Sequence, residues 1–272
     1  MEAKKIERII LLLLALLNLA LLVVVLRDYA ERQRSRGETQ AVLTALLTEN
    51  GIETAPSVEL LQSCPPACTL TRDLDMEQQR VRRLLGRGYH ALDQGGSIWF
   101  YESDRGQLVM RGTGEMALLL TGEDVLRGSS GAKAVQNYFA RAELSLFSIG
   151  AEEGDSIRLC CGWNGCPVFN AGLQCDFSAG RLYMVSGTMV FNVESQTEPE
   201  AGMDSVSALV RFVNLGSAEG IIFSRLDGLA PGYYVHLTMS GESTLTPVWR
   251  IETDTGSFYL NAVTGLLETP PA

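Results

Sequence analysis

Six cysteines are the residues of this chain best suited to chemistry, because a thiol can form a disulfide, bind a metal or act as a nucleophile. They fall into two groups, Cys64 with Cys68, and Cys160, Cys161, Cys166 and Cys175. An even number of cysteines in an exported domain favours disulfides, and six cysteines allow about 15 connectivities. Cys64 and Cys68 enclose two prolines that bend the chain into a small loop. The segment from Cys161 to Cys166 reads as a hairpin that brings its two cysteines near each other.

Two other roles for these cysteines remain open. Unpaired buried thiols are the second interpretation, and zinc is the third, since the spacing lacks the paired C-x-x-C knuckles of common zinc sites. A redox enzyme is disfavoured because no C-x-x-C motif occurs. We therefore treat all six as candidate disulfide cysteines, and we expect no metal and no cofactor.

Catalytic groupings outside the cysteines are scarce. The two histidines, His90 and His236, belong to no metal-binding pattern, and no nucleophile elbow, P-loop or dinucleotide fingerprint occurs. The carboxylate pairs Glu102/Asp104 and Glu252/Asp254 could serve as acid and base, but they read more simply as strand faces and turn formers. The expectation is a protein that is not an enzyme and has no catalytic residues.

A membrane anchor is predicted near the N-terminus. Ile9–Leu26 contains eighteen residues with no charge and one amide, Asn18. A helix of that length spans about 27 Å, close to the hydrocarbon core of a bilayer. No small-residue cleavage site follows it, so the segment reads as an uncleaved single-pass anchor. The short basic tail before it favours a cytosolic N-terminus and an extracellular C-terminal domain, and Asn18 is a candidate contact with a partner helix.

The charge of the remaining chain argues against nucleic-acid binding. Residues 1–36 carry seven basic and four acidic groups, which leaves 15 basic and 28 acidic residues downstream. A body with that excess of carboxylates repels phosphate backbones.

The pattern of apolar residues predicts an α+β ectodomain of helices packed on antiparallel sheets. Helical spacing predicts helices over residues 39–50, 73–85, 132–144 and 205–214, and alternation predicts strands over 97–111 and from 156 onward. The expected organisation is a cytosolic tail (1–8), a transmembrane helix (9–26), a helical stalk (27–56), a first α+β module (57–145) and a second (146–272).

One internal similarity suggests that these modules are duplicates, each a helix followed by a hairpin. Residues 97–111 match residues 247–261 without a gap when the first stretch is shifted by 150 positions. Four pairs of identical residues carry the match: Trp99 with Trp249, Glu102 with Glu252, Asp104 with Asp254, and Gly106 with Gly256. Each copy predicts a strand, an Asp-x-Gly turn and a second strand, and the Trp, Asp and Gly of each copy are candidate structural positions of the repeated hairpin.

The last 60 residues resemble a known family. Gly232-Tyr-Tyr234, the stretch Leu245–Asp254 with its Pro-x-Trp, the stretch Phe258–Ala262 and Thr264-Gly265 are similar to the C-terminal signature of the YycH/YycI family, and YycI is the nearer relative in length. PepSY-type domains share this hairpin. The six cysteines depart from the family pattern.

The resemblance implies a non-enzymatic membrane protein that contacts the WalK (YycG) sensor histidine kinase and so regulates a two-component system of cell-wall homeostasis. A YycH-like protein is a further candidate partner. The alternative is an extracellular PepSY-type binding module that contacts or inhibits an envelope peptidase or a wall component. Neither reading involves nucleic acid.

Overall fold

The structure is a computed structural model that describes residues 37–121, 131–148, 154–191, 193–194, 200–237 and 242–270. The predicted tail, the transmembrane helix Ile9–Leu26 and Asn18 lie outside these residues. Within the described ranges, no helix is both long and apolar enough to cross a bilayer. Residues 37–54 form one compact unit, with a helix over 37–49 and the short strand β1 (Glu53–Thr54), and residues from 55 onward form another.

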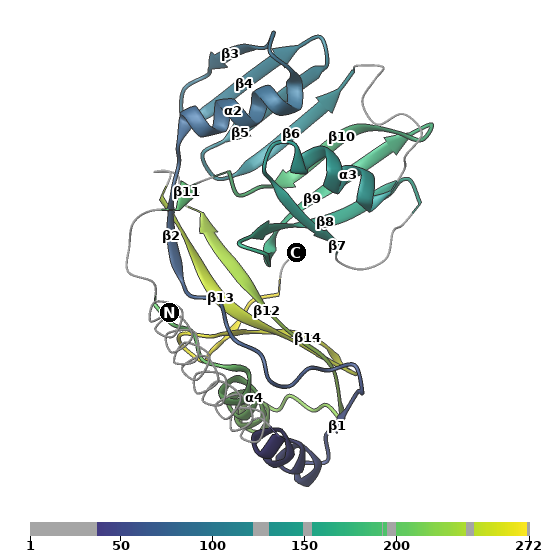
Figure 1. Cartoon of the computed structure of the whole chain (residues 1–272), viewed down its shortest axis with the longest axis vertical. Coiled ribbons are helices and arrows are strands. Elements are labelled where there is room, and N and C mark those ends of the chain that lie inside the picture. Colours follow the sequence, from purple (N-terminus) through teal and green to yellow (C-terminus); the bar gives the residue numbers. More distant parts are fainter. Residues whose placement is uncertain are drawn as a thin grey trace, which may run out of the picture. The chain divides into compact units, whose positions relative to one another are not determined.

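The second unit is built from three consecutive copies of one arrangement, a helix followed by four antiparallel strands (Figure 1). The first copy is α2 (Leu74–Leu85), β3 (His90–Asp93), β4 (Ile98–Ser103), β5 (Gly106–Arg111) and β6 (Glu115–Leu120). The second is α3 (Ala132–Ala140), β7 (Ser145–Ser148), β8 (Ser156–Trp163), β9 (Cys166–Ser178) and β10 (Arg181–Thr188). The third is α4 (Ser205–Glu219), β12 (Arg225–Leu237), β13 (Glu242–Thr253), β14 (Gly256–Asn261) and β15 (Leu267–Glu268).

In every copy each strand pairs with the next strand of the chain, so each copy is a meander. Two contacts then merge the copies into a single mixed sheet. β6 pairs antiparallel with β10, and Val168 of β9 pairs parallel with Tyr233 of β12. The Asn170 amide strengthens the second junction, since it donates to the Val235 carbonyl (2.9 Å) and accepts from the Val235 N–H (2.8 Å).

Two short strands complete this sheet. β2 (Cys68–Thr71) pairs with the start of β13, and β11 (Val193–Glu194) pairs with β2. The strand order is therefore β11-β2-β13-β12-β9-β10-β6-β5-β4-β3, with β14 and β15 beyond β13, and β8 and β7 beyond β9.

This architecture corrects the predicted fold class. The expectation of two helix-plus-hairpin modules on separate antiparallel sheets was wrong: one mixed sheet joins three longer repeats, and one of its junctions is parallel. The physical reason is the length of β9. Its second half pairs with β10 and its first half reaches β12, so no sheet edge remains between the copies.

Both predicted hairpins are nevertheless present, with the same register. Ser103 pairs with Gly106 across the first turn, and Thr253 pairs with Gly256 across the second. The helices begin close to their predicted starts, and Asp73 caps α2 by accepting from the backbone N–H of Asp75 and Met76.

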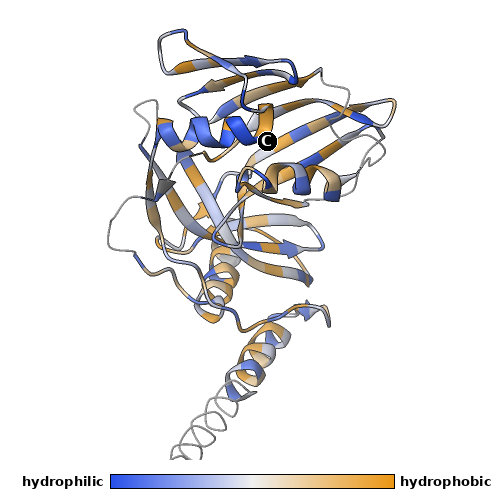
Figure 2. Cartoon of the chain, turned by 45° about the horizontal axis from the view of Figure 1, so that its top comes forward, coloured by the Kyte–Doolittle hydropathy of each residue, from blue (hydrophilic) through white to orange (hydrophobic). Residues whose placement is uncertain are grey.

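The largest hydrophobic core lies between the sheet and the helices α2 and α3, which Figure 1 shows on the same face. α2 is mostly hydrophilic in Figure 2 because it buries only a narrow stripe, which includes Val81, Leu84 and Leu85. The core continues from these residues to Leu245 of β13.

Candidate functional site

The face of the sheet opposite α2 and α3 carries side chains that are mostly exposed or half-buried. Successive side chains of a strand point to opposite faces, and β6 shows this directly: Met116, Leu118 and Leu120 are buried, while Glu115, Ala117 and Leu119 are exposed. The cross-strand registers extend this second set over the neighbouring strands. We call it the open face; it comprises His90, Leu92, Ile98, Phe100, Glu102, Gln107, Val109, Arg111, Glu115, Ala117, Leu119, Met184, Ser186 and Thr188.

An apolar row crosses the open face. The register aligns Leu92, Phe100, Val109 and Ala117 on four adjacent strands. Leu92 is 58% exposed, and Leu119 in the next row is 42% exposed. Contiguous apolar side chains in water are characteristic of protein-binding surfaces, because a partner that covers them gains the hydrophobic free energy of their burial.

Polar side chains flank this row. Gln107 Nε2 donates to Glu102 Oε1 at 2.7 Å, and Arg111 Nε lies 3.5 Å from Glu115 Oε2. The open face thus has an apolar centre and a polar border, as protein interfaces do.

The strand β3, at the end of the sheet, borders the apolar row. Gln94 N–H donates to the Ile98 carbonyl at 2.9 Å, so even-numbered residues of this strand direct their backbone groups to β4. The N–H and C=O groups of Ala91 and Asp93 therefore point away from the sheet. All four residues of β3 are exposed, which makes this edge accessible to an added strand.

The structure divides the six cysteines differently from their order in the sequence. All six are free thiols. The Tyr233 hydroxyl donates to the Pro66 carbonyl at 3.1 Å, and its pKa is raised by burial and, to a lesser extent, by the charges of Cys68, Cys166 and Cys64. Cys160, Cys161 and Cys175 are buried in the sheet, with at most 1% of each exposed.

The hairpin predicted between Cys161 and Cys166 is present, but its two cysteines are not directly opposed: Cys161 pairs with Val168, and Cys166 pairs with Trp163. Burial raises the pKa of Cys161 to about 12 and that of Cys160 to about 11. Thiols with such pKa values stay protonated at neutral pH and are poor nucleophiles.

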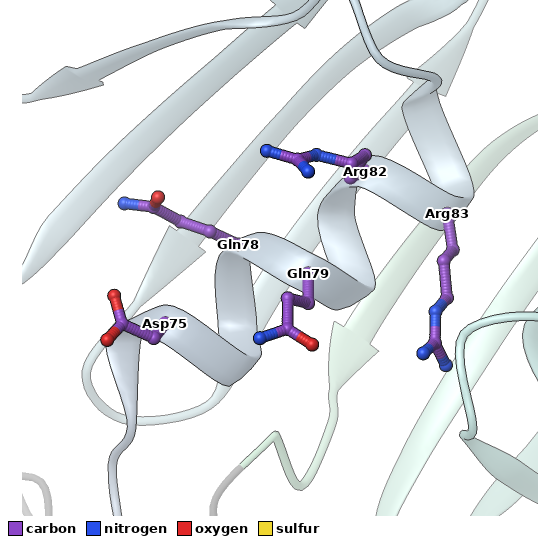
Figure 3. A pocket seen from close by; sticks show the side chains of 5 residues that line it. All are labelled: Asp75, Gln78, Gln79, Arg82 and Arg83. Atoms are coloured by element: carbon purple, nitrogen blue, oxygen red, sulfur yellow. The ribbon is translucent and has the colours of Figure 1, made fainter.

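A shallow polar pocket of about 500 Å³ lies along α2 and is lined by Asp75, Gln78, Gln79, Arg82 and Arg83 (Figure 3). The five residues are spaced along one side of the helix. Arg83 also forms an exposed ion pair with Glu143. Two amides, two guanidinium groups and one carboxylate can hydrogen-bond a polar ligand, but the set has no nucleophile with a neighbouring base.

The other predicted residues do not assemble into a site. His90 and His236 are both exposed, on β3 and β12. Asp254 lies in the turn between β13 and β14. Its carboxylate accepts from the Ser224 hydroxyl and from the backbone N–H groups of Ser224 and Arg225, and these hydrogen bonds lower its pKa. Among the residues described, no cluster of three or more histidines, cysteines or carboxylates could hold a metal ion.

The two repeated tryptophans have different surroundings. Trp249 is fully buried, and its Nε1 donates to the carbonyl of Met203, two residues before the start of α4, at 2.9 Å. Trp99 is half-buried and stacks on Tyr101, with ring centroids 6.1 Å apart. The repeat therefore preserves the hairpin but not the contacts of its tryptophan.

Sequence reasoning missed a buried polar cluster under α2. Glu77 is 1% exposed and accepts from Arg72 Nε (2.8 Å), Arg72 Nη2 (3.1 Å) and the Tyr101 hydroxyl (2.8 Å). Arg80, 8% exposed, donates to the Phe191 carbonyl. Helical spacing could have indicated this burial, because Glu77 and Arg80 fall on the same stripe of the helix as the apolar Val81 and Leu84.

Comparison with known proteins leaves the family of this chain open. No protein-family model matches the sequence, and no curated protein matches it. Among solved structures, an uncharacterized protein from Eubacterium rectale ATCC 33656 is similar over 79% of this chain and 90% of its own, with 8% identity and a TM-score of 0.46. The resemblance to the YycH/YycI family therefore stays a prediction.

Proposed function

We propose that this chain is a non-enzymatic, membrane-anchored regulatory protein that acts by binding a partner protein through the open face. The observation that carries the proposal is the apolar row of Leu92, Phe100, Val109 and Ala117, which borders the exposed edge of β3. A sensor histidine kinase is the partner class that the sequence resemblance suggests. The predicted helix Ile9–Leu26 would hold both proteins in one membrane.

The physical requirement for regulation is differential binding. A bound protein changes the activity of a kinase only if it binds the two signalling states of that kinase with different affinities. A sheet face suits this role, because the strand registers fix the positions from which its side chains project.

The experiment is an affinity purification of the full-length protein from its native membrane in mild detergent, read by mass spectrometry. It compares the wild type with Leu92→Lys, which places a charge at the β3 end of the apolar row, on its most exposed described leucine. The matched control is Ile222→Lys, since Ile222 is 85% exposed and lies in the loop after α4. We expect Leu92→Lys to reduce recovery of the main partner about tenfold or more, because a charge would be buried against the partner, and Ile222→Lys to leave it unchanged.

Each outcome has a defined meaning. A sensor kinase that is lost only in Leu92→Lys supports the proposal. An envelope peptidase with the same dependence supports the binding-module alternative in its place. Equal recovery of the partner by all three proteins, with equal melting temperatures, would show that the open face is not the binding surface.

A further inference from the structure

The strand β3 is an uncovered edge at one end of the strand order of the sheet (Figure 1). All four of its residues are exposed, and the N–H and C=O groups of Ala91 and Asp93 point away from β4. Within the part of the chain that the structure describes, nothing hydrogen-bonds to these backbone groups. A row of unpaired backbone groups at a sheet edge is a template for a further strand.

The other edge strands of this unit are partly covered or very short. Gln136 of α3 donates from Nε2 to the Leu146 carbonyl of β7 at 3.0 Å, and the Leu146 side chain is buried. β11 and β15 each contain two residues. Among these edge strands, β3 is the one that is both longer than two residues and exposed along its whole length.

β3 also lacks the features that keep other chains away from a sheet edge. Natural proteins protect an exposed edge with lysine, proline or a bulge. The sequence of β3 is His90-Ala-Leu-Asp93, and it pairs with β4 without a register shift. Such an edge can accept a strand from another protein, a mode of recognition in which main-chain hydrogen bonds supply the affinity.

The apolar row of the open face ends at this edge, at Leu92, which is 58% exposed. β3 to β6 all pair antiparallel, and an added antiparallel strand would hydrogen-bond to Ala91 and Asp93. It would also place one side chain opposite Leu92, on the open face. An apolar side chain at that position extends the row by one strand and covers Leu92, so the hydrophobic effect favours binding.

The charge of the edge selects a second position of the added strand. Asp93 is exposed, and its Oδ1 accepts from the Gly95 N–H at 2.8 Å, which holds the carboxylate in place. A lysine or arginine directly opposite a carboxylate stabilises a strand pair. A second copy of β3 cannot supply this charge, because no basic residue occupies the outward positions Tyr89, Ala91 and Asp93.

We propose that the partner bound at the open face contributes an extended segment, which pairs antiparallel with β3 as an additional strand. The segment has a lysine or arginine opposite Asp93, and the next residue along it is apolar and lies opposite Leu92. The inference rests on the proposed function, because it names the part of the partner that reaches the edge of the same surface. It goes further in one respect, since binding to the open face alone needs no backbone hydrogen bond.

The first test removes one backbone donor from the edge of the full-length protein, in the affinity purification described above. Ala91→Pro deletes the outward N–H and no bond to β4, so the sheet can keep its ladder. We expect it to reduce recovery of the main partner about tenfold or more. Ala91→Val keeps the N–H and should lose less than about threefold. Ile222→Pro is the matched proline control, because Ile222 is 85% exposed in a loop, and it should leave recovery unchanged.

Asp93→Asn tests the basic residue of the segment. The asparagine keeps a side-chain oxygen for the Gly95 N–H and removes the charge. Recovery of the partner should fall about two- to fivefold. Unchanged recovery would overturn the assignment of a basic residue opposite Asp93.

The remaining test reads the backbone directly and needs no variant. Hydrogen–deuterium exchange of the wild type, alone and with the co-purified main partner, is measured by mass spectrometry at single-amide resolution. Strand addition should slow exchange of the Ala91 and Asp93 N–H groups about tenfold or more in the complex. The N–H of Leu92 already faces β4 and should change less.

The outcomes separate this inference from the proposed function. If Leu92→Lys loses the partner while Ala91→Pro binds it as the wild type does and exchange at β3 is unchanged, the partner uses the open face without adding a strand. Retention of the partner by both variants, or recovery of no partner by the wild type, overturns both proposals. Exchange at Ala91 that slows with increasing concentration of the wild type alone would identify a second copy as the occupant and overturn the assignment to a partner.

Discussion

Removing the positive charge from the buried Arg72–Glu77 pair should destabilise the fold more than any surface ion pair does. In Arg72→Met the Glu77 carboxylate, 1% exposed, loses hydrogen bonds of 2.8 and 3.1 Å and keeps only the Tyr101 hydroxyl. A buried charge left without its partner costs about 3–5 kcal/mol, so the free energy of unfolding should fall by that amount.

The reverse change should cost less. In Glu77→Gln the amide oxygen can still accept from Tyr101, and Arg72, 12% exposed, still donates from Nη1 to the Ser97 carbonyl at 3.1 Å. We expect a loss of about 2–3 kcal/mol. The double variant Arg72→Met/Glu77→Gln should lose less than the sum of its single changes, since no unpaired charge remains.

The assay is urea unfolding at pH 7, followed by circular dichroism, with the slope of the transition compared between variants. Arg111→Met is the matched control, because Arg111 and Glu115 are 56% and 61% exposed, and it should cost less than about 1 kcal/mol. An Arg72→Met variant that lost no more than this control would refute the reasoning, as would single changes that simply add.

The repeated hairpins supply a second matched pair. Gly106 has φ +153°, and a Cβ at this position would lie 2.1 Å from the Leu119 carbonyl oxygen. Gly256 has φ +146°, but a Cβ there would meet open space. In thermal unfolding, Gly106→Ala should therefore cost about 3 kcal/mol or more, and Gly256→Ala about 1–2 kcal/mol. Stability should also decrease above pH 9 and continue to fall towards pH 12. The folded state keeps the protons of Cys161 and Tyr138 up to a higher pH than the unfolded chain does, because burial raises both pKa values to about 12. Unchanged unfolding midpoints between pH 8 and 11 would contradict this.

Local sequence patterns predicted the hairpins and helices well because those elements depend on nearby residues. Asp-x-Gly turns at Asp104 and Asp254 and the Asp73 cap act within a few positions of the chain. The middle copy does not show the repeated sequence pattern, because its hairpin turns at Asn164-Gly165 and its β9 contains a bulge. The joining of the copies could not be predicted, since it depends on strand ends that meet only in the folded sheet.

The sequence did not predict the open face either. β6 alternates apolar and exposed positions, but Leu119 is as apolar as the buried Leu118, so composition does not say which side is covered. That depends on where α2 and α3 pack. The surroundings of Tyr233 could not be predicted for the same reason, because β9 approaches Tyr233 only through its pairing with β12 in the folded sheet.

The position of β2 has a consequence for synthesis. Its residues 68–71 pair with residues 242–245, which a ribosome makes much later than β2 itself. The three meanders consist of neighbouring segments and can each form as they emerge. The β13 side of β2 must wait, with its backbone groups unpaired, until residues 242–245 have been made. A chain truncated before residue 242 would therefore keep a permanently open β-edge at β2, and quality-control proteases would have a specific feature by which to distinguish incomplete molecules from finished ones.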